Sequence, residues 1–280
     1  MDEQNLNRYA PPRTPLAEQA REVETDSYLG EPQAVGMGRA MAWLHDAWSL
    51  FKQRPGKWMG AVLLILLVNI GITLLPVIGP LLQPLLITFL LAGVAYAAQD
   101  TEQYGNFSIG DIFSTGFRER ALSLLGVGLF TFALTLLYIA IVYFVFGSDV
   151  LQAYLDNVQE GMPNSLKAMN LVFVIVYLSL TFLAPTLIIL QGEKLFRAIG
   201  LSLKGFLRNI GGAFWCSLLM FLAFFGVIFS GAVLTGFLES LAPALGKAAL
   251  VVLAVAVLAC LPVLFILPYA VYRDLFFEQE

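Results

Sequence analysis

Charged side chains are scarce in this sequence, and their scarcity excludes a soluble globular fold. Only 13% of the 280 residues are Asp, Glu, Lys or Arg, whereas 59% are hydrophobic. A soluble domain carries about a quarter charged residues, and it cannot keep so large an apolar fraction away from water. We therefore expect the lipid bilayer to surround most of the chain.

Metal-ligating and nucleophilic residues are also few. The chain has one histidine, His45, and two cysteines, Cys216 and Cys260, which both lie in apolar runs. A zinc or haem site needs several such ligands, and the sequence contains no C-x-x-C pair, Walker loop or G-x-S-x-G motif. We predict no metal site, no cofactor site, no catalytic residue and no enzymatic activity. A basic tract is absent as well, so nucleic acid is not an expected partner.

The first 37 residues form a polar segment that differs from the rest of the chain. They are rich in Pro, Glu, Gln and Arg, and residues 1–36 carry the whole net charge of −4. Such a segment cannot bury enough apolar surface to fold alone. We predict a disordered cytoplasmic tail over residues 1–37, not a cleaved signal peptide, with an extended stretch at Tyr9-Ala10-Pro11-Pro12.

Six apolar runs follow, and each has about the length that crosses a bilayer. None contains Asp, Glu, Lys or Arg between its ends. The sequence therefore predicts an all-α membrane protein in which residues 38–280 form one six-span domain. The expected transmembrane spans are 57–75, 81–98, 121–146, 170–190, 210–237 and 248–272.

An amphipathic helix is expected just before the first span, over residues 39–54. Its large apolar residues recur at helical spacing and share one face, and Pro55-Gly56 ends it. Such a helix is typical of a membrane surface, where aromatic rings lie at the headgroup level. The predicted interface anchors are Trp43, Trp48, Phe51 and Trp58.

A similar unit occurs three times along the chain. Amphipathic stretches that lead to Arg54, Arg120 and Arg208 are each followed by a small or helix-breaking residue and then by a membrane hairpin. The sequence thus predicts three hairpins in a parallel pseudo-threefold internal repeat, each preceded by an amphipathic helix at the interface. An alternative stays open, because any hairpin with cytoplasmic ends can begin with an amphipathic basic segment.

The distribution of Lys and Arg predicts the orientation. Of the 16 such residues, only Lys167 and Lys247 fall on the side opposite the tail. Because cytoplasmic loops are enriched in Lys and Arg, we expect the tail, the even-numbered connections and the C-terminus to be cytoplasmic.

Polar residues inside the first two spans are the candidate functional residues, because they are costly in lipid. Asn69 and Thr73 lie in the first span, and Gln83 and Thr88 lie in the second. If their amides met across the hairpin, these residues would form either interhelical hydrogen bonds or a polar cavity. Small residues at Gly226, Ser230 and Gly231 favour close helix packing within one chain or in a homo-oligomer.

Several short motifs resemble those of a family of uncharacterised proteobacterial inner-membrane proteins. They are Asn7-Arg8-Tyr9-Ala10-Pro11-Pro12, in which Arg8 replaces the family's usual proline, Gly38-Arg39, Trp43, Ala47-Trp48-Ser49-Leu50-Phe51, Pro55-Gly56-Lys57-Trp58 and Phe117-Arg118-Glu119-Arg120. The chain looks more distantly like the membrane module found beside some glycerophosphodiester phosphodiesterases, but it has no phosphodiesterase domain. The resemblance implies a multi-pass protein of the bacterial inner membrane with no assigned activity.

Two functions fit these features. The first is a non-enzymatic inner-membrane protein of the scaffold, assembly or envelope-homeostasis type, which contacts membrane lipids and binds a cytoplasmic protein through residues 1–37. The second is a transporter or flippase for a lipid or another apolar or amphipathic solute, which the repeat, Pro185, Pro262 and the Asn69–Gln83 pair would favour.

The orientation can be tested with reporter fusions. We expect alkaline phosphatase to be active when it is inserted after Glu160, and a fluorescent protein to fluoresce when it is fused to Glu280, because the arginine and lysine distribution holds these positions on opposite sides. Inactive alkaline phosphatase at Glu160, or a non-fluorescent fusion at Glu280, would contradict the predicted orientation.

Overall fold

The computed structural model describes residues 28–75, 78–156, 158 and 161–278. Within this part of the chain the regular secondary structure is helical, apart from one isolated antiparallel bridge between Tyr28 and Phe277. Six helical segments are long and apolar enough to cross a membrane. These findings confirm the predicted all-α multi-pass membrane fold.

The helices fall into three consecutive units, each led by one amphipathic helix. The first unit contains α2 (Arg39–Gln53), α3 (Pro55–Thr73) and α4 (Ile78–Tyr104). The second contains α5 (Ile109–Glu119), α6 (Ala121–Phe146), α7 (Ser148–Leu155), α8 (Asn164–Thr181) and α9 (Ala184–Gln191). The third contains α10 (Leu195–Arg208), α11 (Ile210–Leu241) and α12 (Pro243–Phe276).

The spans differ from their predicted bounds in two ways. The fourth span, 164–191, is interrupted at Phe182–Leu183. Pro185 lies in the first turn of α9, where a backbone N–H has no partner within the helix, so the proline costs no helical hydrogen bond. The sixth span continues through Pro262 and Pro268 as one helix of 34 residues. A helix of that length is about 51 Å long, so it extends beyond a bilayer core of about 30 Å.

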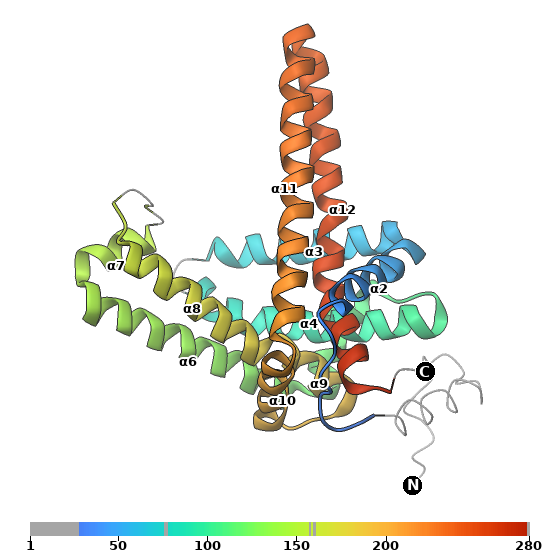
Figure 1. The fold of residues 1–280 in the computed structure, drawn as a ribbon, viewed down its shortest axis with the longest axis vertical. Coiled ribbons are helices and arrows are strands. Elements are labelled where there is room, and N and C mark those ends of the chain that lie inside the picture. The colour runs from blue at the N-terminus through green and yellow to red at the C-terminus, as the bar shows by residue number, and fades with distance from the viewer. Residues whose placement is uncertain (1–27, 76–77, 157, 159–160, 279–280) are drawn as a thin grey trace.

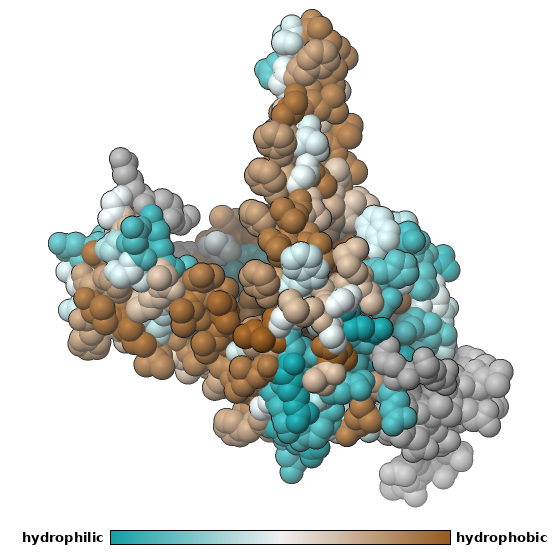
Figure 2. All heavy atoms as spheres, in the orientation of Figure 1, coloured by the Kyte–Doolittle hydropathy of each residue, from teal (hydrophilic) through white to brown (hydrophobic). Residues whose placement is uncertain are grey.

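The molecule consists of a packed base and three hairpin arms (Figure 1). The arm of α11 and α12 rises from the base, and the arm of α6 and α8 leaves it in another direction, with α7 at its far end. Figure 2 shows apolar side chains along the arms, whereas hydrophilic ones gather at the base and at the far ends of these two arms. This distribution suits arms in lipid and a base at a polar surface.

The core of the base is built from the second helices of the three hairpins. The buried stretches are Phe89–Ala98 of α4, Leu183–Ile189 around α9 and Val263–Phe276 of α12, and these helices pack against one another. Alanine is frequent in the α4 stretch, which lets neighbouring backbones approach closely.

The amphipathic helices enclose this core in a cyclic order. Helix α5 packs on α4, and α10 packs on α8 and α9, so each covers the second leg of the preceding hairpin. Helix α2 has no preceding hairpin, and it packs on α12 at the other end of the chain. The three units therefore form a closed ring, in which the first unit meets the third.

The junction between amphipathic helix and span has nearly the same backbone conformation in all three units. A single non-helical residue separates the two helices: Arg54 (φ −143°, ψ 60°), Arg120 (φ −138°, ψ 32°) and Asn209 (φ −125°, ψ 30°). The third junction lies at Asn209, one residue after the Arg208 expected from the sequence. This similarity is consistent with the internal repeat, which remains a prediction.

The predicted disordered tail ends earlier than expected. Residues 28–37 are packed on the base, where Leu29 N–H donates to the Phe276 carbonyl (2.9 Å) and Gln33 N–H donates to the Leu275 carbonyl (2.8 Å). These contacts correct the prediction for 28–37, because backbone pairing with the last helix supplies the order that a polar sequence lacks by itself. Residues 1–27, with the Tyr9-Pro12 stretch, lie outside the described residues.

Close packing of α4 and α5 depends on Gly93, where any side chain would overlap the Ile112 carbonyl. We expect Gly93→Val to reduce stability by about 1–3 kcal/mol or more, because the two backbones must separate. The measurement is thermal unfolding in detergent. Gly71→Val is the matched control, since it adds the same side chain to a helix with open space around it. Equal unfolding temperatures for the two variants would contradict the packing of α5 on α4.

Candidate functional site

A buried carboxylate at the end of α12 joins the two ends of the chain. The Asp274 side chain is 3% exposed, and both of its oxygens accept hydrogen bonds from α2. Arg39 donates from Nε to Oδ2 (3.0 Å) and from Nη2 to Oδ1, and Trp43 donates from Nε1 to Oδ2 (2.6 Å). The hydrogen bond to Asp274 raises the pKa of Arg39. Hydrogen bonds between charged partners of this kind are stronger than those between neutral groups.

The segment Tyr28–Val35, which we call the strap, crosses from α12 to α10. On the α12 side its backbone pairs with Leu275 and Phe276, and Gln33 Nε2 donates to the carbonyls of Asp274 (3.1 Å) and Phe277 (2.6 Å). The ring of Tyr28 stacks on Phe276 at 5.8 Å between centroids. The strap therefore covers the end of α12 and shields the Asp274 backbone from water.

On the α10 side the strap is held by polar side chains. Asn209 accepts a hydrogen bond from Val35 N–H (2.6 Å) and donates to the Gln33 carbonyl (2.9 Å). Lys204 pairs with Glu31 and lowers the pKa of that carboxyl, chiefly through the hydrogen bond. Arg208 donates to the Pro32 carbonyl. These contacts connect the third unit to the segment that leads into the first.

Comparable contacts occur at the other two junctions of the ring. Arg54 Nε donates to the Gly105 carbonyl in the loop before α5 (3.0 Å). Arg120 lies against Gly192 in the loop before α10, where an added Cβ would come within 2.6 Å of Nη2. Each junction residue thus contacts the loop that enters the next unit.

Each of these three loops contains a glycine with positive φ: Gly30 at 70°, Gly105 at 66° and Gly192 at 69°. Residues with a side chain rarely adopt this conformation. The repeated glycine allows each of these three segments to turn on the base before the amphipathic helix that follows it.

The predicted polar residues of the first hairpin bond to their own helices. Asn69 Nδ2 donates to the Ile65 carbonyl (2.8 Å), Thr73 to the Asn69 carbonyl (2.9 Å) and Thr88 to the Pro84 carbonyl (2.8 Å). Gln83 is exposed. Among the described contacts, Asn69 and Gln83 form no amide pair, because a nearby carbonyl one turn back already satisfies Asn69.

The predicted interface anchors are placed differently from one another. Trp43, Phe51 and Trp58 are buried in the base, with Trp58 packed against Phe107 at 4.3 Å between ring centroids. Only Trp48 keeps a large exposed fraction, 42%. The prediction of lipid anchors is therefore wrong for three of these residues, because the apolar face of α2 packs on α12 rather than on lipid and Trp58 of α3 packs against Phe107.

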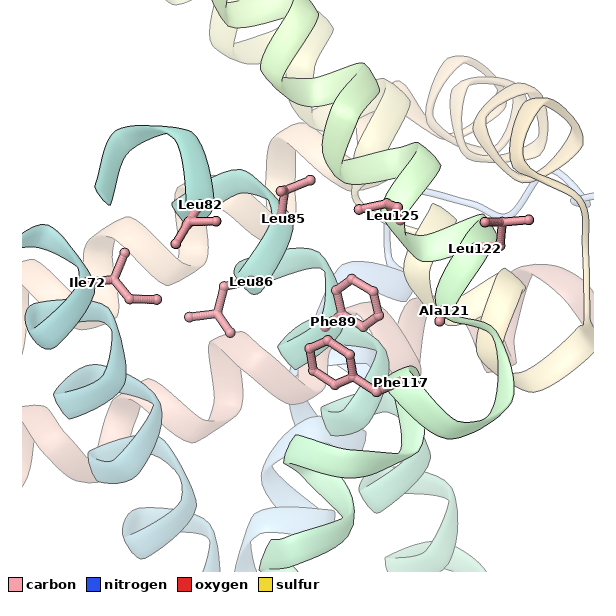
Figure 3. Close-up of a pocket in the computed structure, with 9 residues that line it drawn as sticks. All are labelled: Ile72, Leu82, Leu85, Leu86, Phe89, Phe117, Ala121, Leu122 and Leu125. Atoms are coloured by element: carbon pink, nitrogen blue, oxygen red, sulfur yellow. The ribbon is translucent and has the colours of Figure 1, made fainter. Parts of the chain in front are cut away.

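A cavity of about 410 Å³ lies between the first arm and the part of the second arm next to the base. Its walls come from α3, α4, α5 and α6 (Figure 3). The residues that line it are Ile72, Leu82, Leu85, Leu86, Phe89, Phe117, Ala121, Leu122 and Leu125. All of these side chains are hydrophobic, so the cavity suits a hydrocarbon group and offers no polar path.

Sequence reasoning did not identify Asp274 as a partner of Arg39 and Trp43. It made no prediction for Asp274, and it treated Trp43 as an anchor at the membrane interface. The only available signal was an acid within four residues of an apolar span, which is common at helix ends. The groups of the Asp274 cluster are hydrogen-bonded to one another, an arrangement that holds helices together.

Comparison of the chain with protein-family models, with curated proteins and with solved structures gives no match.

Loss of the Asp274 carboxylate should open the contact between α2 and α12. We expect Asp274→Ala to reduce stability by about 2–4 kcal/mol, because it removes the acceptor that the buried Trp43 donor shares with Arg39. Unfolding in detergent measures the change. Asp46→Ala removes an exposed carboxylate from α2 and should have little effect. Equal stability of the two variants would show that Asp274 does not hold the helices together.

Proposed function

We propose that the protein is a non-enzymatic scaffold of the bacterial inner membrane, of the assembly or envelope-homeostasis type, in which the closed base carries three membrane arms. The observation that supports this function most directly is the closure of the base by Asp274 and the strap, since it fixes the arms to one rigid unit. Contacts between fixed hydrogen-bonding partners are typical of structural sites, whereas catalysis needs groups left available for a substrate.

The predicted orientation agrees with the position of the basic residues. In the described part of the chain Lys167 and Lys247 lie at the far ends of the second and third arms, and the other Lys and Arg residues belong to the base or to its loops. We infer that the base and both termini are cytoplasmic. We also infer that the three units descend from an internal repeat, which their shared junction conformation supports.

The tail is the proposed attachment point for a cytoplasmic protein. The strap enters the base directly after residue 27, so a partner that holds residues 1–27 would be coupled to the contact between α10 and α12. An extended segment such as Tyr9-Ala10-Pro11-Pro12 binds with little loss of conformational entropy.

A lipid transporter or flippase is the second candidate, and the cavity between the first two arms favours it. Transport of a whole phospholipid needs a route for its polar headgroup. In the described residues the cavity lining is apolar, and Asn69, Thr73 and Thr88 bond to their own helices. These features favour the scaffold.

The scaffold function is tested by affinity capture from membranes followed by quantitative mass spectrometry. We expect removal of residues 1–27, and equally the combined change Tyr9→Ala, Pro11→Ala and Pro12→Ala, to abolish recovery of a reproducible set of cytoplasmic proteins. Glu22→Ala with Glu24→Ala is the control that changes the tail but keeps the extended stretch. Recovery of the same proteins by all variants would exclude the tail as the attachment point.

A further inference from the structure

The base end of the cavity between the first two arms is flanked by basic residues. Phe117 and Ala121 both line the cavity, and the three residues between them are Arg118, Glu119 and Arg120. All three are exposed. The segment between the lining residues therefore carries two positive charges and one negative charge, and it lies where α5 ends and the membrane-crossing α6 begins.

The shape of the cavity fits a single hydrocarbon chain. Its α4 wall runs from Leu82 to Phe89, a helical length of about 10 Å. At one end of this wall the ring of Phe89 stacks on that of Phe117 of α5, at 4.1 Å between centroids. Farther along α6 the arms come together, because an added Cβ at Gly128 would lie 2.8 Å from the Leu85 Cα. The cavity is thus a bounded slot between two arms and not an open face of one helix.

We propose that this slot binds one acyl chain of an anionic phospholipid, whose phosphate group is bound by Arg118 in the last turn of α5. A guanidinium donates paired hydrogen bonds to phosphate oxygens, and Arg118 is the exposed residue that follows the lining residue Phe117 at the end of α5. The bound lipid fills the space between the first and second arms. It acts as a structural ligand of the membrane domain, independently of any partner of the tail.

Charge complementarity distinguishes this site from ordinary lipid contacts along the arms. The exposed apolar surfaces of α11 and α12 contact lipid without a basic residue beside them for most of their length, since between Ile210 and Phe276 the only Lys and Arg are Lys247 and Arg273. At the slot, by contrast, an apolar cavity open to its surroundings has two arginines between its lining residues in the sequence.

Native mass spectrometry of the full-length protein tests the proposal with two lipids that have the same acyl chains, phosphatidylglycerol and phosphatidylcholine. We expect one phosphatidylglycerol to stay bound under detergent conditions that remove phosphatidylcholine. Arg118→Gln should weaken phosphatidylglycerol binding about fivefold, the contribution of one cation near an anionic surface, and leave phosphatidylcholine unchanged. Lys52→Gln removes an exposed cation from α2 and should leave both unchanged.

A second variant tests the apolar part of the site. Ala121→Phe places a phenyl ring in the slot and should reduce retention of both lipids, whereas Ala254→Phe adds the same group to the exposed face of α12 and should not. Equal retention of the two lipids by the wild-type protein would show an unselective lipid layer and overturn the proposal. The proposal would also be overturned if Arg118→Gln retained as much phosphatidylglycerol as Lys52→Gln, or if Ala121→Phe retained as much of both lipids as Ala254→Phe.

Discussion

The buried carboxylate of Asp274 is the interaction on which the arrangement of the base depends. A chain of three successive hairpins can pack each amphipathic helix on the hairpin before it, but its first amphipathic helix has no such neighbour. Arg39 and Trp43 of α2 instead donate hydrogen bonds to Asp274, on the last helix of the chain, so α2 packs there. Because the Asp274 carboxylate is buried, loss of its hydrogen bonds to Arg39 or Trp43 is costly, so the contact holds both ends of the chain together.

The ring explains why the base can be rigid although the arms bury little surface. In α11 only 6% of the most hydrophobic stretch is buried within the protein, whereas in the Leu82–Tyr104 segment half is. In lipid, exposed apolar side chains cost no free energy, so the arms need little packing of their own. Helix-to-helix specificity is concentrated instead at the base, where hydrogen bonds between distant segments fix the order of the units.

The sequence predicted the helices of this structure well, because apolar runs of membrane-spanning length have few other solutions. It also predicted the three amphipathic helices and placed two of the three junction residues, Arg54 and Arg120. It did not predict that Trp43, Phe51 and Trp58 are buried, since the periodicity of an apolar face is the same whether that face meets lipid or another helix. Nor did it predict the strap, whose order comes from contacts with residues more than 170 positions away.

Sequence patterns were equally unable to predict the contacts of the candidate site. The polar residues Asn69 and Thr88 were selected because polar groups are costly in lipid, but threonine and asparagine can meet that cost through a carbonyl of their own helix. The cavity between the arms could not be found from sequence, since its lining consists of the leucines and phenylalanines that occur in any span. Only the approach of α4 to α6 distinguishes these residues from others like them.

The closure of the ring can be measured directly with an engineered disulfide between residues 28 and 277. Tyr28 and Phe277 are paired in an antiparallel bridge, and such pairs have Cα separations of about 4.5–5.5 Å, within the range of a disulfide. In a protein with Cys216 and Cys260 replaced by alanine, the account predicts that Tyr28→Cys with Phe277→Cys forms an intramolecular disulfide, whereas Tyr28→Cys with Ser49→Cys does not. Failure of the first pair to cross-link within one molecule would contradict the closed ring.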